Sequence, residues 1–269
     1  MTISGKTNSG SPAGILDQRI AIVVGGARGL GQAIAAAFAG VGATVVIADR
    51  DAATAATTAQ AIGGATTALG SVDISDPAAP AAMVEAVVAR HGGLDILVNC
   101  AAICLVDPLL DVTPERFDRV FAVNTRGSFF CLQAAARAMI PRGRGRIISI
   151  STPASRLGFP LFASYGASKA AVDSISRSAA LAWAPHGITV NTIVPGRMTG
   201  GMVDELERDL VQVTGKSAEQ LVAERTKNLP MGRRVEPAEV AQAAVWLASD
   251  AAAYVTGERF NFTGGMELA

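Results

Sequence analysis

Short apolar runs alternate with longer amphipathic segments along most of the chain. Ile20–Val24 and Thr44–Ala48 are nearly continuous in apolar and β-branched residues, which is typical of strands buried on both faces. Between them, residues 29–41 carry apolar side chains at helical spacing. The same patterns predict strands at 66–72, 94–98, 146–150, 188–193 and Arg259–Phe262, and helices at 51–62, 77–91, 114–140, 164–183 and Pro237–Ala248. This alternation predicts an α/β fold, a single doubly wound parallel sheet of about seven strands with helices on both faces.

Two stretches of the chain, residues 1–17 and 195–235, lack the regular alternation of strands and helices. Residues 1–17 are rich in Ser, Gly and Thr and hold no apolar segment, so we expect a flexible tail rather than a signal peptide or membrane anchor. Residues 18–269 then form one domain, because no linker or repeat divides them. The least regular internal stretch, residues 195–235, mixes apolar and charged positions, which predicts a substrate flap with a lid helix. No uncharged apolar run reaches the roughly 18 residues of a membrane span.

The charge balance argues against a nucleic-acid partner. Lys plus Arg and Asp plus Glu both number 23, so no net positive charge attracts a phosphate backbone. Arg142, Arg144 and Arg146 form a short basic cluster, but glycines separate them and no aromatic residue lies between them. We interpret this cluster as a solvated turn.

Cysteine and histidine usage argues against disulfides and metal sites. Cys100, Cys104 and Cys131 are odd in number and lie in apolar contexts, as expected of reduced thiols in a cytoplasmic protein. His91 and His186 are the only histidines, and neither has a second ligand at metal-binding spacing. We therefore expect no bound metal.

A glycine-rich turn follows the first predicted strand and opens the first predicted helix. Its three glycines have the spacing Gly-x3-Gly-x-Gly, which lets backbone N–H groups approach a pyrophosphate where the helix dipole favours negative charge. A glycine triplet alone also marks ordinary turns, but Asp49 ends the next strand, where a carboxylate accepts hydrogen bonds from an adenosine ribose. The turn therefore predicts a dinucleotide site, with loop contacts from Gly25, Arg28, Gly29, Leu30 and Gly31.

Asp49 also indicates which dinucleotide binds. A carboxylate at this position repels the additional 2′-phosphate of NADP, so we predict NAD as the cofactor. Arg28 and Arg50 are counter-evidence, because either side chain could reach a phosphate. Arg50 could instead be an ordinary surface residue.

Tyr165 and Lys169 occur in Ser-Tyr-Gly-Ala-Ser-Lys, within a predicted helix. At positions i and i+4 they share one helix face. Because a nearby positive charge favours phenolate, we expect Lys169 to lower the tyrosine pKa from about 10 and make Tyr165 a general base. The pair alone could be a surface Tyr and Lys on an amphipathic helix, but the dinucleotide signals elsewhere in the chain argue for catalysis.

Together these residues resemble the short-chain dehydrogenase/reductase family of single-domain Rossmann enzymes, over residues 20–265. Asn124, Tyr165 and Lys169 match three members of its catalytic tetrad. The resemblance implies that Asp73 contacts the adenine, that the motif beginning at Asn99 stabilises the sheet beside the cofactor, and that a Pro-Gly turn lies beside the nicotinamide. It thereby extends the cofactor-binding residues to Asp73, Ile74, Asn99, Ala101, Tyr165, Lys169, Pro195, Gly196 and Thr199.

The chain departs from the family pattern at three positions. Val24 replaces the usual threonine ahead of the first glycine. Where the tetrad serine is expected, thirteen residues before the tyrosine, the chain has Thr152, which keeps the hydroxyl, and a slip of one residue would present Ser151 instead. Gly200 stands where the family has a threonine after the Pro-Gly turn, and Thr199 lies one position earlier.

The resemblance implies reversible hydride transfer between an alcohol carbon and the nicotinamide. Tyr165 would exchange the hydroxyl proton, Thr152 would hold the substrate oxygen, Lys169 would hydrogen-bond the nicotinamide ribose, and Asn124 would hold a water that links the lysine to solvent. No cluster of Arg or Lys is evident beside the expected pocket. We therefore favour a small neutral secondary alcohol or polyol, with its ketone, as the substrate.

Two alternatives remain open. An NADPH-dependent 3-ketoacyl thioester reductase would have the same fold, but Asp49 argues against NADPH. A non-catalytic dinucleotide-sensing module is the second, against which the intact Tyr165 and Lys169 pair argues. The resemblance also implies a homotetramer, or a dimer, built through the helices of Asn124 and Tyr165 and the C-terminal strand.

Overall fold

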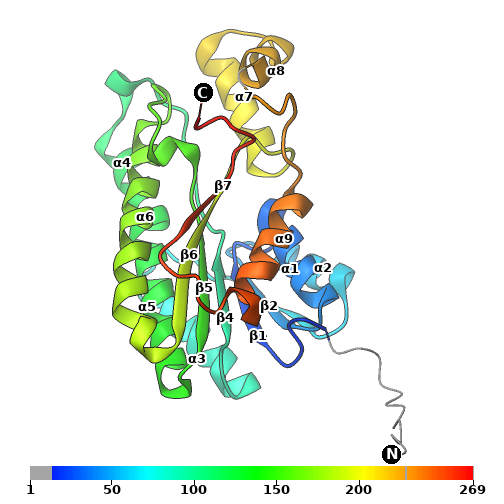
Figure 1. The fold of residues 1–269 in the computed structure, drawn as a ribbon. Coiled ribbons are helices and arrows are strands. Elements are labelled where there is room, and N and C mark those ends of the chain that lie inside the picture. The colour runs from blue at the N-terminus through cyan, green and yellow to red at the C-terminus, as the bar shows by residue number, and fades with distance from the viewer. Residues whose placement is uncertain (1–13, 228, 269) are drawn as a thin grey trace, which may run out of the picture.

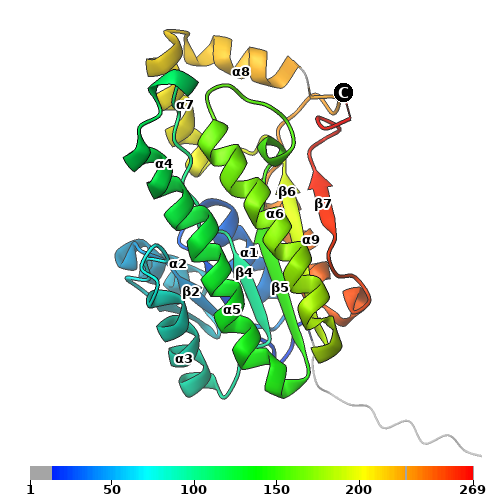
Figure 2. The same cartoon turned by 90° about the vertical axis from the view of Figure 1, so that its left-hand side faces the viewer.

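The structure, a computed structural model, describes residues 14–227 and 229–268. Its centre is a seven-stranded parallel sheet in the order β3-β2-β1-β4-β5-β6-β7 (Figures 1 and 2). The strands are β1 Ile20–Val24, β2 Thr44–Ala48, β3 Thr66–Leu69, β4 Ile96–Asn99, β5 Gly145–Ile150, β6 Ile188–Pro195 and β7 Arg259–Phe262. This order reverses direction between β1 and β4, which is the point where doubly wound sheets bind ligands. The predicted fold class is confirmed.

Helices cover both faces of the sheet. One face is covered by α1 Gly29–Gly40, α2 Ala52–Ile62 and α9 Pro237–Ala248, and the other by α3 Ala79–His91, α4 Pro114–Phe121, α5 Ser128–Met139 and α6 Ala163–Trp183 (Figure 1). Because side chains alternate along a strand, Ala21 and Val23 of β1 pack into the core under α1 and α9, whereas Ile22 and Val24 pack into the core under α3 and α5. Both faces of the central strands are therefore apolar.

The predicted flap lies beyond the carboxyl ends of the strands. It contains two helices, α7 Met202–Thr214 and α8 Ala218–Lys227, where the sequence predicted one lid helix (Figures 1 and 2). Gly215 follows α7 in the left-handed conformation, with φ 69°, which ends that helix and starts the turn to α8.

Several predicted boundaries differ from the structure, two of them in ways that affect the fold. The helix expected over 114–140 is interrupted at Ala122–Gly127 by a π-helical turn. Residues 1–13 of the predicted tail lie outside the described residues, but Leu16 is fully buried and its N–H donates to the carbonyl of Val41 at 2.9 Å. The ordered domain therefore begins before residue 18, because an apolar side chain at position 16 joins the core.

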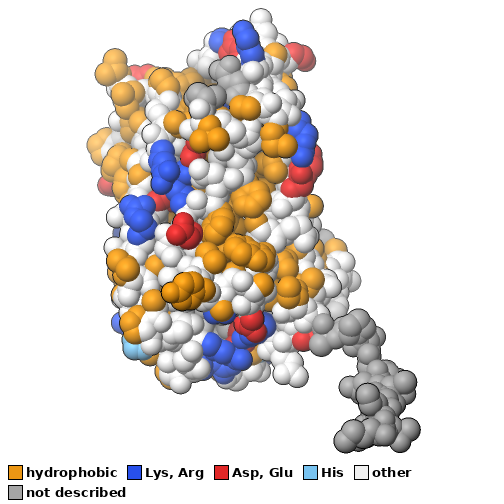
Figure 3. Space-filling model, in the orientation of Figure 1, with side chains coloured by type: hydrophobic (Ala, Val, Ile, Leu, Met, Phe, Trp, Pro, Cys, Tyr) orange, Lys and Arg blue, Asp and Glu red, His pale blue; other side chains and the backbone are white. Residues whose placement is uncertain are grey.

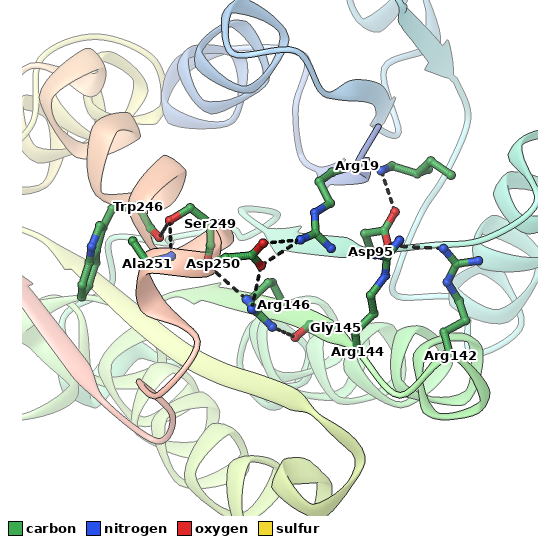
Figure 4. A network of polar contacts seen from close by, with 11 residues as sticks. Arg19, Asp95, Arg142, Arg144, Gly145, Arg146, Trp246, Ser249, Asp250 and Ala251 are labelled. Carbon is green, nitrogen blue, oxygen red and sulfur yellow. Dashed lines mark hydrogen bonds and ion pairs between the residues drawn. The ribbon is translucent and has the colours of Figure 1, made fainter. Parts of the chain in front are cut away.

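The basic cluster beside β5 lies at an exposed turn, as interpreted, and its arginines also form ion pairs that the sequence did not indicate. Arg142 and Arg144 lie 3.4 and 2.8 Å from the carboxylate of Asp95, which is 2% exposed (Figure 4). Arg146 lies 3.4 Å from Asp250. A buried carboxylate needs compensating charge, and the two arginines supply it at the amino-terminal end of β4.

Neither a membrane-spanning helix nor a metal cluster occurs in the described part of the chain. No helix there is long and apolar enough to cross a bilayer. Among the same residues, no three His, Cys, Asp or Glu side chains gather closely enough to hold a metal ion.

Candidate active site

A cavity of about 860 Å³ lies at the carboxyl ends of the strands and under the flap. Almost all of the residues that the sequence singled out line it: Gly25, Arg28, Gly29, Leu30, Gly31, Asp49, Arg50, Asp73, Ile74, Ala101, Thr152, Tyr165, Lys169, Pro195, Gly196 and Thr199. The two remaining ones, Asn99 and Asn124, are 3% and 0% exposed and lie behind the cavity wall. The fold thus brings the predicted cofactor and catalytic residues to one place.

The glycine loop is packed so closely that side chains would not fit. Gly25 has φ 74°, and a Cβ there would lie 2.7 Å from the backbone nitrogen of Ala101. A Cβ on Gly31 would lie 2.1 Å from the carbonyl oxygen of Gly25. These glycines allow the first turn of α1 to lie directly against the ends of β1 and β4, with its N-terminus in the cavity. This is the cradle that a pyrophosphate requires.

Asp49 is oriented by the backbone at the end of β2. Its carboxylate accepts hydrogen bonds from the N–H groups of Ala27, at 3.1 Å, and Asp51, at 3.0 Å. The side chain of Asp51 in turn forms an ion pair with Arg28. Arg50 is close enough to Asp73 to lower the pKa of that carboxyl, although two hydrogen bonds from Ser75 lower it more. Both arginines at this end of the cavity therefore lie near carboxylates.

The hydroxyl that faces the tyrosine belongs to Thr152. Thr152 follows β5, and its hydroxyl accepts a hydrogen bond from the N–H of Ala154 at 3.3 Å and is close enough to Tyr165 to lower the pKa of the phenol. Ser151 is 3% exposed, and its hydroxyl oxygen is buried without a partner among the residues that the structure describes. Of the two candidates, Thr152 is placed beside the phenol.

The pKa of Tyr165 differs from the sequence-based prediction. Burial raises it well above its ordinary value of 10.0, the Cys104 thiol adds to the rise, and the Thr152 hydrogen bond opposes it. Burial also lowers the pKa of Lys169 from 10.5 to about 8. The prediction that Lys169 lowers the tyrosine pKa was wrong, because desolvation penalises the phenolate and the charge of Lys169 does not offset that cost.

Asn124 supports the cavity wall from inside the π-helical turn. Its Oδ1 accepts from the N–H of Ile103 at 2.8 Å, and its Nδ2 donates to the carbonyl of Ile103 at 2.9 Å and to Ser168 at 3.0 Å. The extra residue in such a turn redirects a side chain and frees backbone groups. The freed carbonyl of Asn124 accepts from Ser128, which accepts from Asn99 at 2.8 Å. The sequence showed the polar residue in an apolar helix but not the turn.

The first residues of the flap approach the glycine loop. A Cβ on Gly29 would lie 3.5 Å from the Cα of Gly201, at the start of α7. Thr199, which precedes Gly200 and Gly201 in the chain, donates its hydroxyl to Glu236 at 2.6 Å. The start of the flap therefore lies against the glycine loop at the cavity.

Three arginines on the cavity wall were missed by the sequence reading. Arg197, Arg225 and Arg234 lie far apart along the flap, yet all of them line the cavity. The expectation that no basic cluster lies beside the pocket was therefore wrong. No local motif could have indicated it, since only the folding of the flap brings the three together.

A doubly wound sheet with a glycine cradle, an acid after β2 and a Tyr/Lys pair on α6 defines an oxidoreductase that uses a nicotinamide dinucleotide. Residues 25–267 match the family model adh_short_C2, described as "Enoyl-(Acyl carrier protein) reductase". The chain belongs to the short-chain dehydrogenase/reductase family, and it acts on CH–OH groups.

Individual relatives extend over nearly the full chain. Galactitol 2-dehydrogenase of Agrobacterium fabrum is 41% identical, covering 93% of this chain and 98% of that protein. Sorbitol dehydrogenase of Cereibacter sphaeroides is 38% identical with the same coverage. A solved structure from Beutenbergia cavernae, assigned as an NAD(P)-dependent gluconate 5-dehydrogenase and holding NADP at low occupancy, is 33% identical with a TM-score of 0.86, covering 94% of this chain and 98% of that one.

Proposed function

We propose that this protein is an NAD-dependent dehydrogenase that interconverts a secondary alcohol or polyol and its ketone. One observation carries the proposal. A single cavity has the glycine cradle and Asp49 at one end, and the hydroxyl groups of Thr152 and Tyr165 beside Lys169 at the other. The relatives that act on galactitol and sorbitol support a polyol as the substrate.

The proposed chemistry divides between cofactor and protein. The nicotinamide, when bound, accepts or returns the hydride. The Thr152 hydroxyl orients the substrate oxygen, and Tyr165 takes the hydroxyl proton in oxidation or returns it in reduction. Lys169, whose ammonium donates to the carbonyl of Ile150 at 2.7 Å, supplies the positive charge beside the phenol and a donor for the nicotinamide ribose. Because burial keeps the phenol protonated, reduction starts from the resting protonation state and oxidation needs deprotonation first.

The support from Asn124 is indirect in this proposal. It holds both backbone groups of Ile103 on the cavity wall, and it donates to Ser168. Ser168 donates in turn to the carbonyl of Tyr165 at 2.7 Å. Asn124 therefore positions Tyr165 through Ser168 and holds the cavity wall at Ile103. A water that joins Lys169 to solvent would bind near Asn124.

The preference for NAD rests on the ribose end of the cavity. Asp49 lies where a 2′-phosphate would have to bind. Arg28 is already neutralised by Asp51, and Arg50 lies near the carboxylate of Asp73. These carboxylates partly offset both arginines, which supports NAD, whereas Arg119 on the same cavity wall and the NADP found in one similar structure are counter-evidence.

The proposed assembly rests on exposed aromatic side chains, and the proposed location rests on the free thiols. Phe117 and Phe129 are exposed on α4 and α5, and Trp246 and Tyr254 are exposed near β7. Figure 3 shows hydrophobic side chains gathered over the face that carries β7 and α9. We propose a homotetramer, or a dimer, of single catalytic domains that include Leu16 at their start, each with a flap at 195–235. The three free thiols fit a cytoplasmic location.

Steady-state kinetics test the proposed function. Nicotinamide reduction is followed at about pH 9 with NAD or NADP across polyols, secondary alcohols and hydroxyacyl thioesters. The proposal expects turnover of an alcohol or polyol, with NAD preferred by kcat/KM. Turnover restricted to thioesters with NADP would replace it by a ketoacyl reductase, and tight NADH binding without turnover of any alcohol would support a sensing module.

A further inference from the structure

The flap builds a basic wall on the cavity. Arg197 follows β6, Arg225 belongs to α8, and Arg234 lies between α8 and α9, and all three line the cavity that Tyr165 also lines. Burial, and then repulsion from the other two arginines, lowers the pKa of Arg197 to about 10. The three guanidinium groups are therefore close enough to act on one another.

One carboxylate serves all three arginines. Glu207 is the only acidic side chain that opposes the lowered pKa of Arg197, and it forms an ion pair with Arg234. Nε of Arg197, and Nε and Nη1 of Arg225, are buried and have no hydrogen-bond partner within residues 14–227 and 229–268. Buried N–H groups on a cation are costly unless an acceptor satisfies them. Two guanidinium groups on the cavity wall are thus left in need of an anion.

The other acidic residues of the cavity do not fill this need. Glu205 and Asp209 are exposed, and neither is among the charges that shift the pKa of Arg197 or Arg225. Glu224 is held by Lys216 at 2.7 Å. Asp209 does act on the neighbouring Cys104 thiol, but three arginines against Glu207 leave the basic wall with a net positive charge.

The basic wall lies on the substrate side of the cavity. Arg225 is close enough to Cys104 to lower the pKa of its thiol, although burial raises that pKa more strongly, to about 12. The same thiol is close enough to affect Tyr165. Cys104, which lines the same cavity, is thus close to both the phenol and the arginine, whereas Asp49 and the glycine loop belong to the proposed cofactor end.

We propose that the alcohol substrate carries an anionic group, a carboxylate or a phosphate monoester, which binds between Arg197 and Arg225 while its hydroxyl group faces Thr152 and Tyr165. This inference rests on the proposed dehydrogenase function and narrows its substrate class. Guanidinium groups suit both anions, because their planar N–H groups bind two oxygens at once. A neutral polyol would leave the two arginines unpaired.

Matched substrates test the subsite. For wild type and Arg225→Met, kcat/KM with NAD is measured for six-carbon polyols, the corresponding aldonates and the corresponding phosphate monoesters. Arg208→Met is the control, because Arg208 is exposed on α7 and does not line the cavity. We expect wild type to favour one class of anion over the neutral polyol, and Arg225→Met to reduce that preference about 10- to 100-fold, the range of a lost charge-assisted hydrogen bond. Arg208→Met should keep the wild-type preference.

The substrate class that wild type prefers shows whether the subsite binds a carboxylate or a phosphate monoester. The tested quantity is kcat/KM for the anionic substrate divided by kcat/KM for the neutral polyol. If this ratio is the same in wild type and Arg225→Met, the subsite is refuted, even when a polyol is oxidised and the proposed function holds. Weaker NADH binding in Arg225→Met, with no change in the ratio, would assign the arginine to the cofactor and also overturn it.

A binding measurement separates the two proposals. Aldonate and phosphate monoester are titrated by calorimetry into NADH-saturated wild type and Arg225→Met. Binding to wild type that is lost in Arg225→Met supports the subsite whether or not turnover is seen, and equal heats in both proteins contradict it. Failure of every alcohol with both cofactors would refute the dehydrogenase itself.

Discussion

The ammonium nitrogen of Lys169 lies 2.7 Å from the carbonyl oxygen of Ile150, the last residue of β5. This contact anchors a lysine that is 2% exposed to the sheet end from which Thr152 extends. It also holds a charge where water is largely excluded, and burial lowers the lysine pKa from 10.5 to about 8. The site therefore keeps a cation at a cost in stability.

Replacing this lysine should stabilise the protein and inactivate it. The shift of its pKa corresponds to a cost on the order of 3 kcal/mol at neutral pH, and Lys169→Met also leaves the Ile150 carbonyl unpaired, which offsets about 1 kcal/mol. We expect the free energy of unfolding of Lys169→Met to exceed that of wild type by about 2 kcal/mol in urea. Lys227→Met, at an exposed position on α8, serves as the control and should change little.

The same lysine predicts a pH dependence of stability. Its folded pKa lies below its unfolded value, so the unfolded chain binds more protons between about pH 8 and 10.5. The contribution of this group to the free energy of unfolding should rise with pH across that window, and Lys169→Met should lack the rise. Parallel pH profiles for the two proteins would show that the buried charge is not the source.

Oxidation and reduction should respond differently to pH. Burial raises the pKa of Tyr165, so the phenolate that oxidation needs becomes about tenfold more populated for each unit of pH. We expect log kcat/KM for oxidation to rise with a slope near one between about pH 6 and pH 8, whereas reduction, which uses the protonated phenol, stays nearly flat. An oxidation profile that is flat over this range would mean that another group takes the proton.

Arg259 should support Thr152 through a buried ion-pair network. Its guanidinium lies 2.7 Å from the carboxylate of Glu267 and 3.3 Å from that of Asp173, and the three side chains are only 6 to 8% exposed. It also donates a hydrogen bond to the carbonyl of Thr152 at 3.3 Å. Arg259→Met leaves two buried carboxylates without a cation, so we expect a loss of about 3 to 5 kcal/mol in the free energy of unfolding and a lower kcat.

The exposed pair of Arg233 and Glu239 provides the matched control for this network. Its side chains are 53% and 43% exposed, so Arg233→Met should cost less than about 1 kcal/mol. If Arg259→Met is no more destabilising than Arg233→Met, the network does not stabilise the loop of Thr152.

Asp49 should control the choice of dinucleotide. Asp49→Asn retains an oxygen that can accept from the N–H of Ala27, but it removes the charge that repels a 2′-phosphate. We expect the ratio of kcat/KM for NAD to that for NADP to fall about 10- to 100-fold. Asp51→Asn, which releases Arg28 instead, is the comparison. An unchanged ratio in Asp49→Asn would assign cofactor choice to other residues.

Local patterns predicted the sheet well. The runs of apolar and β-branched residues placed β1 and β2 at their observed residues, because a strand buried on both faces has few polar positions. The glycine spacing and the Tyr/Lys spacing are also local, so they marked the two ends of the cavity before the fold was known. Each of these features depends on residues that are close in sequence.

Features that depend on tertiary contacts were missed or misjudged. The π-helical turn at Asn124 is maintained by hydrogen bonds to Ile103, from another segment. The pKa of Tyr165 depends on burial, which spacing does not report. Arg197 and Arg225 meet only because the flap folds back over the cavity. In each case the deciding interaction joins residues distant in sequence.

The most direct test of the catalytic account compares wild type with Tyr165→Phe under NAD-dependent polyol oxidation, with the dissociation constant for NADH measured by fluorescence. If Tyr165 exchanges the substrate proton, kcat should fall by about 10² to 10⁴, the range for general acid–base catalysis, while NADH binding stays nearly unchanged. Near-normal turnover by Tyr165→Phe would contradict the account.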